Sequence, residues 1–504
     1  MKRTKNLFAA IFGVVFFFFS LASTVRAQIE IGDLSVSGEA GVSGLPRSFS
    51  GSKAKFEEYR DIPETAVVPE IKLQIERKQN DFYFDFDATK PGLNDQNFKL
   101  RAGRYGLLDM EFEWEQFPHN FNLDTAQTPY RSSNGGGTLT LSNKPTGTVD
   151  PVAARLGNPA SPVFPPVQGT ASTTTCATNA FCKWLDGLNT SPLLNSDLHP
   201  VDLSLLNRIA RFKLRYTPSP GWTFSGSYWS NNNTGKRAFG SYVGTSPGAY
   251  NITELPEPID YQTHNIELGG EYAGKGWSLG LKYNASLFHN NVGTLVWDNP
   301  INLSNVNLAT GALTGPCIDS RTYAVSSSTG AITGSQWGPC QSRMDLYPSN
   351  QAHTITLTGA ASLPLKTHFL STVSYGWRLQ DDSFLPFTSN RCFTTNPAEV
   401  GTTDLTRCTT ALLAMPTINR RNLGGDIRPL TVNATLVNNF FQDLNLKASY
   451  RLYNLDNQSN RFTLPQGLVI NDVSINNADI GAENRFVQYS KNTVGLDASY
   501  NITR

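Results

Sequence analysis

The sequence has only one long apolar segment, and it lies at the amino terminus. After residues 7–22 no second apolar run of that length follows, although a helix needs about twenty apolar residues to cross a bilayer. A helical membrane protein is therefore excluded. The mean hydropathy of −0.30 still permits a membrane β-barrel, because only alternate residues of its strands face lipid.

The sequence also lacks an excess of positive or negative charge, and it lacks the common catalytic motifs. The net charge of +1 gives no electrostatic reason to expect nucleic acid as a partner. There is no C-x-x-C-H haem attachment motif, Walker loop or G-x-S-x-G motif. We expect this chain to be no enzyme and to bind no cofactor or metal. The histidines are dispersed, without metal-ligand spacing: His119, His199, His264, His289, His353 and His368.

Six cysteines are present, and none forms a C-x-x-C pair of the kind typical of zinc and redox sites. An even number of cysteines in an exported protein indicates disulfides. Local pairing is the simplest connectivity, and it would place each disulfide within one loop. The predicted pairs are Cys176 with Cys182, Cys317 with Cys340, and Cys392 with Cys408.

The amino-terminal residues have the pattern of a signal peptide. Lys2, Arg3 and Lys5 precede the apolar run, and small residues Val25 and Ala27 precede a cleavage position before Gln28. We expect residues 1–27 to be removed on export and residues 28–504 to form the mature chain.

The segment LLDMEFEWE at 107–115 alternates apolar and acidic residues. Side chains of a strand point to opposite faces with a period of two, so one face is apolar and the other carries carboxylates. Alone, this strand fits a soluble sheet equally well. However, the same alternation recurs at 71–77, 82–87, 98–102, 210–216, 222–229, 266–272, 277–284 and 444–452.

The connections between these segments alternate in length. Short turns, such as those near 104–106, 218–221 and 274–276, lie at one end, and Trp222 and Trp277 follow two of them, where an aromatic girdle would lie. Strands of about ten residues tilted by about 45° span roughly the 25 Å apolar band of outer-membrane barrels. We predict an all-β protein, a large antiparallel transmembrane barrel of about fourteen strands, incomplete at its carboxyl end. The long loops are expected near 118–205, 231–260, 290–350, 380–427 and 455–484.

If the apolar face meets lipid, the charged face lines the lumen. The acidic strand lies between two basic strands in sequence order, which predicts a salt-bridged wall. Two interpretations stay open for these charges: solubility and register of the wall, or contact with a hydrophilic partner. The main predicted lumen charges are Lys99, Arg101, Asp109, Glu111, Glu113, Glu115, Arg211, Lys213 and Arg215; further ones are Lys72, Glu76, Asp85, Asp87, Glu267, Glu271, Lys282, Lys447 and Arg451.

Several segments resemble the MtrB/PioB-like family of outer-membrane β-barrels associated with decahaem cytochromes. They occur in order along most of the mature chain, and together they are fairly specific. They are SKAKFEEYRDI at 52–62, NFKLRAGRYGLLDMEFEWEQFPHNF at 97–121, EPIDYQT at 257–263, LVWDNP at 295–300, QDDSFLPFTSN at 380–390 and YRLYNLDNQSNRF at 450–462.

The resemblance implies an outer-membrane scaffold of a Gram-negative bacterium that sheathes a multihaem c-type cytochrome. Electrons would then pass between periplasmic and extracellular multihaem c-type cytochromes, with haem carried by the partner. A porin or substrate-specific channel is the main alternative, and a secreted β-rich adhesin is a third. Two features depart from the family: no cysteine precedes Cys176, and the chain ends on Arg504 where barrels usually end on an aromatic residue. The second departure suggests a fragment.

Overall fold

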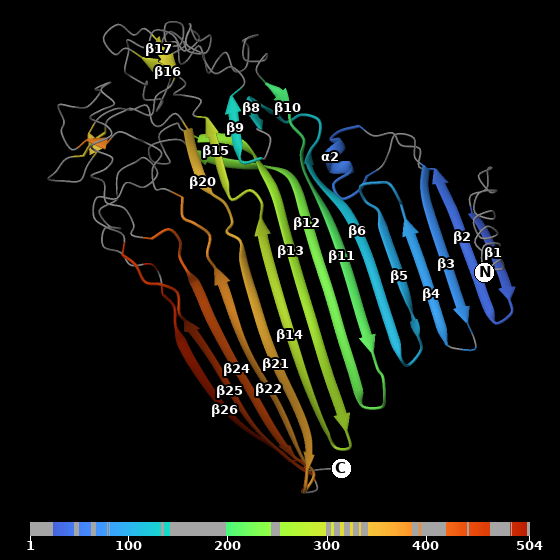
Figure 1. Cartoon of the computed structure of the whole chain (residues 1–504). Helices are drawn as coiled ribbons and strands as arrows, with labels where there is room; N and C mark the ends of the chain where they lie inside the picture. The colour runs from blue at the N-terminus through green and yellow to red at the C-terminus, as the bar shows by residue number, and fades with distance from the viewer. Residues whose placement is uncertain are drawn as a thin grey trace, which may run out of the picture.

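The computed structural model of the chain has one dominant sheet and several small loop elements (Figure 1). Residues 1–23 of the predicted leader, which was expected to span 1–27, lie outside the described residues, and its last four residues begin the strand β1. All six cysteines also lie outside the described residues, so the predicted disulfides stay predictions. The structure describes residues 24–44, 50–61, 67–77, 79, 81–132, 136–141, 198–242, 252–298, 304–306, 313–316, 323–325, 332–333, 341–385, 393–394, 420–440, 443–463, 484 and 486–500.

The dominant sheet has fifteen strands, against about fourteen expected, and every neighbouring pair is antiparallel. Strand order follows the sequence, and over the described residues β1 and β26 do not pair, so the sheet is open. Figure 1 shows these two strands at opposite edges of a curved wall. The strands are β1 (Thr24–Ile31), β2 (Leu34–Gly44), β3 (Val67–Arg77), β4 (Phe82–Thr89), β5 (Asn97–Arg104), β6 (Leu108–Asn122), β11 (Leu203–Tyr216), β12 (Trp222–Tyr242), β13 (Ile252–Gly274), β14 (Trp277–Asn290), β21 (Asn350–Leu363), β22 (Thr367–Gln380), β24 (Gly425–Asn438), β25 (Leu444–Asn457) and β26 (Tyr489–Tyr500).

Short turns lie at one end of the sheet and long connections at the other, as predicted (Figure 1). One expected long loop is wrong: most of 231–260 is strand, because β12 and β13 stay paired from Trp222 opposite Tyr272 to Tyr242 opposite Ile252. Beyond the lipid the residues of this hairpin no longer alternate between an apolar and a polar face. Asn231, Asn232 and Asn233 are polar in succession, and Leu255 packs into a buried apolar cluster, so the period-two signal that marks a membrane strand disappears.

Pro256 and Pro258 lie within this extended hairpin. Both lie in β13 opposite β12, beyond the point where β14 ends with Asn290 opposite Tyr261. This part of β13 is therefore paired in the main sheet on one side only. A proline lacks a backbone donor and is tolerated on such an edge, so the two prolines do not end the strand.

The two faces of the sheet differ as the alternation predicts. Large apolar side chains are exposed on one face, including Leu281 at 56% and Leu268 at 55%. We call this the apolar face and the opposite one the polar face. Near the short turns the apolar face carries an aromatic belt, in which the rings of Trp222 and Trp277 lie 4.9 and 5.0 Å from the ring of Tyr272. The predicted girdle residues therefore cluster in space.

A second belt on the apolar face lies toward the long connections. The hydroxyl of Tyr228 is 2.8 Å from Nδ1 of His264, and that of Tyr283 is 2.8 Å from Nδ1 of His353. The ring of Trp377 stacks on His353 at 5.4 Å. From Tyr272 to His264, β13 rises by ~27 Å, or ~20 Å after tilt, which approximates the height of the apolar band of such barrels. The two belts mark its boundaries.

The loop connections form a small four-stranded sheet, which we call the loop-end cap. It comprises β8 (Tyr130–Ser132), β9 (Thr138–Leu141), β15 (Thr294–Asp298) and β20 (Gln341–Asp345). The Asp298 side chain is buried and accepts a hydrogen bond of 2.9 Å from Gln341 Nε2. The cap shares its apolar cluster with β13; the members are Tyr130, Leu139, Leu255, Val292, Leu295, Trp297 and Leu346.

Strand register places the loop-end cap on the polar face. Register between β12 and β13 has no shift from Glu271 to Leu255, so these two residues of β13 point to the same side. Phe239, directly opposite Leu255, also packs against the cluster. The cap therefore covers the polar face at the end of the long connections.

The remaining elements are small. The helix α2 (Lys53–Phe56) contacts β6 at its loop end, and its Ser52 cap accepts a hydrogen bond from the Lys55 amide. Within the described ranges no helix is long and apolar enough to cross a membrane. The other short strands are β7 (Gln127–Thr128), β10 (His199–Pro200), β16 (Ser304–Val306), β17 (Leu313–Pro316), β18 (Tyr323–Val325), β19 (Ile332–Thr333) and β23 (Phe393–Thr394).

Leu281→Arg is expected to lower the free energy of unfolding in lipid vesicles by about 2–4 kcal/mol, because the residue lies between the two belts on the apolar face. Asn284→Arg, on the polar face of the same strand, is the control and should change stability by less than about 1 kcal/mol. Urea titrations followed by tryptophan fluorescence measure both values. Equal losses for the two variants would contradict the assignment of the faces.

Arg237→Met should open the extended hairpin of β12 and β13. Arg237 donates to the carboxylate of Glu257, 1% exposed, through Nε at 2.6 Å and Nη2 at 3.2 Å. Removing the cation leaves a buried unpaired charge, which costs about 3–5 kcal/mol. Hydrogen exchange should rise in residues 235–242 and 252–258. Arg77→Met breaks the more exposed pair with Asp33 and should cost at most about 1 kcal/mol; similar exchange in both variants would refute the role of burial.

Candidate lumen surface

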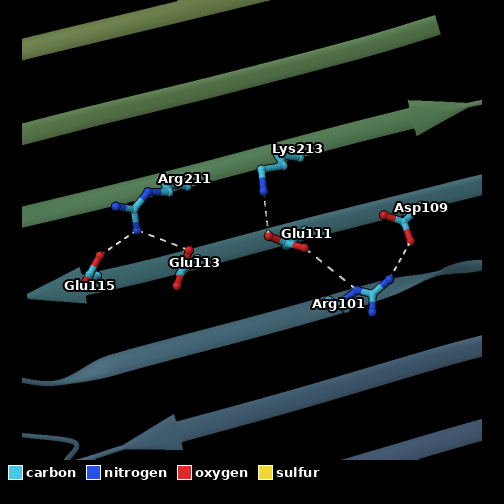
Figure 2. Close-up of polar contacts among 7 residues, drawn as sticks. All are labelled: Arg101, Asp109, Glu111, Glu113, Glu115, Arg211 and Lys213. Atoms are coloured by element: carbon cyan, nitrogen blue, oxygen red, sulfur yellow. Dashed lines mark hydrogen bonds and ion pairs between the residues drawn. The ribbon is translucent and has the colours of Figure 1, made fainter.

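The polar face of β5, β6 and β11 carries a connected set of ion pairs (Figure 2). These strands place basic, acidic and basic side chains side by side, because the antiparallel register sets Arg101 opposite Glu111 and Glu111 opposite Lys213. Lys213 Nζ lies 3.1 Å from Glu111 Oε1. Glu111 and Glu113 of the central strand therefore each lie between cations of the two neighbouring strands.

Arg211 of β11 binds two acids of β6 at once. Its Nη1 donates to Glu115 Oε2 at 2.7 Å and to Glu113 Oε2 at 3.3 Å (Figure 2). The side chains are only partly exposed, at 31% for Arg211, 25% for Glu113 and 38% for Glu115. Partial desolvation strengthens such charge-assisted hydrogen bonds compared with a surface pair. The wall itself therefore neutralises these carboxylates.

Arg101 of β5 organises the turn-side end of the same set. Its Nη2 donates to Asp109 Oδ2 at 3.1 Å, and its Nε lies 4.0 Å from Glu111 Oε2 (Figure 2). Tyr83, from β4, also donates to Asp109 through its buried hydroxyl. The ring lies over Gly103, where a Cβ atom would come within 2.6 Å of the Tyr83 hydroxyl. Only glycine leaves space for this tyrosine.

The alternation of charge continues across six neighbouring strands. In register from β2 to β11, Glu39 lies opposite Lys72, Lys72 opposite Asp87, Asp87 opposite Lys99, Lys99 opposite Glu113, and Glu113 opposite Arg211. We call these residues the charge row. Adjacent opposite charges attract and like charges repel, so the row favours this register over a slipped one. This supports the register interpretation of the predicted lumen charges.

All predicted lumen charges share the polar face by strand register. Seven of the nine main ones form the set in Figure 2. Lys99 lies opposite Glu113, and Arg215 lies opposite Asp109, at positions where the opposite charges attract. The sequence analysis did not predict that Tyr83 contacts Asp109. Tyr83 shares the period-two alternation of Asp85 and Asp87 in β4, and this pattern could have assigned it to the polar face.

The described part of the chain shows no group of three or more His, Cys, Asp or Glu side chains able to hold a metal ion. The charged side chains of the polar face instead keep one side of the sheet in contact with water. Side chains of the face stay partly open to solvent over its height, with 60% exposure for Lys213 and 47% for Lys282. The surface can contact water, a solute or a hydrophilic macromolecule.

Comparison with known proteins agrees with this architecture. Residues 49–504 match the family described as "Putative outer membrane beta-barrel porin, MtrB/PioB". This match covers most of the chain. The chain belongs to the MtrB/PioB family. It is an outer-membrane protein with a porin-like, all-β architecture, as the sequence predicts.

A curated relative from this family is "Outer membrane protein MtrB" of Shewanella baltica (strain OS185). The two are 24% identical over 286 residues, which represent 56% of this chain and 30% of the relative. The chain therefore matches about a third of the length of this MtrB protein.

Solved outer-membrane proteins superpose on the MtrB/PioB-family chain with low scores. OmpT of Vibrio cholerae is 10% identical, with 94% of this chain and 99% of OmpT covered and a TM-score of 0.21. An anion-selective porin of Comamonas acidovorans is 8% identical, with 92% and 89% covered and a TM-score of 0.24. The family assignment rests on the sequence match.

A double-mutant cycle on Arg211→Met and Glu115→Gln should give a coupling energy of about 1 kcal/mol in detergent micelles. The matched control is Lys447→Met with Asp497→Asn, whose charged atoms are 3.9 Å apart and whose side chains are 53% and 70% exposed. Its coupling should be near zero. Equal coupling in both cycles would show that partial burial adds nothing to the pair of Arg211.

Proposed function

We propose that this protein sheathes a multihaem c-type cytochrome and so supports electron transfer across the outer membrane. The observation that carries the proposal is a water-accessible polar face, between the two belts, in a member of the MtrB/PioB family. Charged side chains need water or a hydrophilic partner, because an apolar filling would leave them unsolvated. A water-soluble protein provides such a partner.

The redox centres would belong to the partner. The chain contains no C-x-x-C-H motif, so it attaches no c-type haem. An apolar band about 25 Å high separates the two sides of the membrane, and electrons need closely spaced centres to cross it. We propose that this chain acts without catalysis, as a scaffold exported by its leader, and that multihaem cytochromes on both sides supply the centres.

A diffusion channel is the second candidate function, and the loop-end cap is the observation that favours it. Porins narrow their pore with a loop folded inward, and the cap lies on the polar face. However, the cap meets β13 at Leu255, nine residues beyond His264 of the loop-side belt. This places the contact ~20 Å outside the apolar band after tilt. Among the described residues, the cap contacts the wall beyond the band and not within it, which favours the sheath.

The test is reconstitution of the purified protein in liposomes, alone and with a multihaem cytochrome encoded beside it. The barrel alone should lack the Soret absorption of haem and should not let external dithionite reduce an enclosed dye that cannot cross lipid. With the cytochrome, the enclosed dye should be reduced. The cytochrome should also co-purify with the barrel from detergent extracts.

Swelling assays with sugars separate the two functions. A sheath filled by its partner should not admit sugars, and liposomes with the complex should swell no faster than empty ones. Porin-like swelling by the barrel, combined with failure to retain any haem protein, would establish the channel and reject the sheath. Liposomes with the cytochrome alone are the control for electron transfer without a barrel.

A further inference from the structure

The polar face has a second sector that differs chemically from the charge row. On three neighbouring strands, β21, β22 and β24, most positions that face this side within the band are small and neutral, and many bear a hydroxyl; Leu370, opposite Thr435, is a larger apolar residue among them. We call this surface the hydroxyl stripe. Its members are Thr354, Thr356, Thr358, Thr372, Ser374, Thr431, Asn433 and Thr435.

The register of the three strands brings the residues of the stripe together, although they lie far apart in the sequence. Thr356 lies opposite Ser374, and Ser374 lies opposite Thr431, so each hydroxyl has another hydroxyl beside it. The oxygens of Thr356 and Ser374 are 2.9 Å apart, and these side chains are partly exposed. A hydroxyl has one donor and two acceptor sites, so each retains free capacity toward a molecule in the lumen.

The two sectors differ in the cost of direct contact with a protein. Covering the charge row would desolvate ionised side chains such as Glu113 and Arg211, and that penalty often exceeds the gain from their attraction. Covering a hydroxyl costs little when it forms a hydrogen bond. The stripe also consists of short side chains, which let another protein approach the backbone wall closely.

We propose that the hydroxyl stripe is the surface on which the enclosed protein packs, while a layer of water separates that protein from the charge row. The occupant is a folded, water-soluble protein whose polar side chains bond the threonine and serine hydroxyls. The inference rests on the proposed sheath function and adds the part of the wall that makes the contact.

Site-specific cross-linking tests the placement. A photoreactive phenylalanine analogue at Thr356 or Thr372 of the stripe should form a haem-staining adduct with the co-expressed multihaem cytochrome. The same analogue at Lys99 or Glu113 of the charge row should give several-fold less adduct. Leu357, beside Thr356 but on the apolar face with 43% exposure, is the matched negative control.

A second measurement uses retention of the cytochrome on a tagged barrel. Thr356→Arg should lower the amount retained severalfold, because it introduces a charge that close contact would desolvate. Thr356→Ser keeps the hydroxyl and should retain the wild-type amount. Ser37→Arg, on the polar face of β2 beside Gln74, places the same charge outside the stripe and should have little effect. Heat-modifiable migration in gels verifies that each variant is folded.

The outcomes separate the stripe from the sheath. If the wild-type barrel retains the cytochrome but Thr356 and Thr372 give no adduct, or if charge-row sites give equal or stronger adducts, the stripe is not the contact surface. If the wild-type barrel retains no haem protein, the sheath function itself fails. Adducts at the stripe with loss of retention only in Thr356→Arg support both.

Discussion

A strand in lipid has no water to bond its backbone, so each N–H and C=O must pair with a neighbouring strand. This constraint explains the long antiparallel sheet and its register from β2 to β25, which shifts between β6 and β11 only at Leu203 and Ser204, near the loop end. It also explains why side-chain chemistry separates so completely into two faces. Once the backbone is paired, successive side chains face lipid and the polar side in turn. Every side chain between the two belts therefore lies on one of these two faces.

The charge row on the polar face also stabilises the register of the strands. Lys72, Asp87 and Lys99 alternate in sign across three strands, and a slip by one residue would move each of them into lipid. Such a slip would therefore cost both the attraction and the solvation of the charges. The row stabilises the wall whatever the lumen contains, which is why the acids of β6 by themselves identify no ligand.

The neutral stripe and the loop-end cap bear more directly on what the lumen contains. Another protein could cover the hydroxyl stripe with a small desolvation cost. The loop-end cap lies outside the apolar band, where its cluster includes Leu255. Over the described residues, the cap covers part of the wall beyond the band. The sheath proposed above is compatible with this arrangement.

The sequence by itself determined most of the strands within the band, their two faces and the short turns, because lipid imposes a period of two on such segments. It did not mark β1 and β2. It did not determine the extent of β12 and β13, since outside lipid their residues no longer alternate between an apolar and a polar face and the periodic signal is lost. It also could not place Tyr228 beside His264, or the cap on the polar face, because these contacts join separate segments. Arg211 and Glu115 form an ion pair although they are 96 residues apart in the sequence. Only the register of β6 with β11, set by the folded wall, decides that such residues touch.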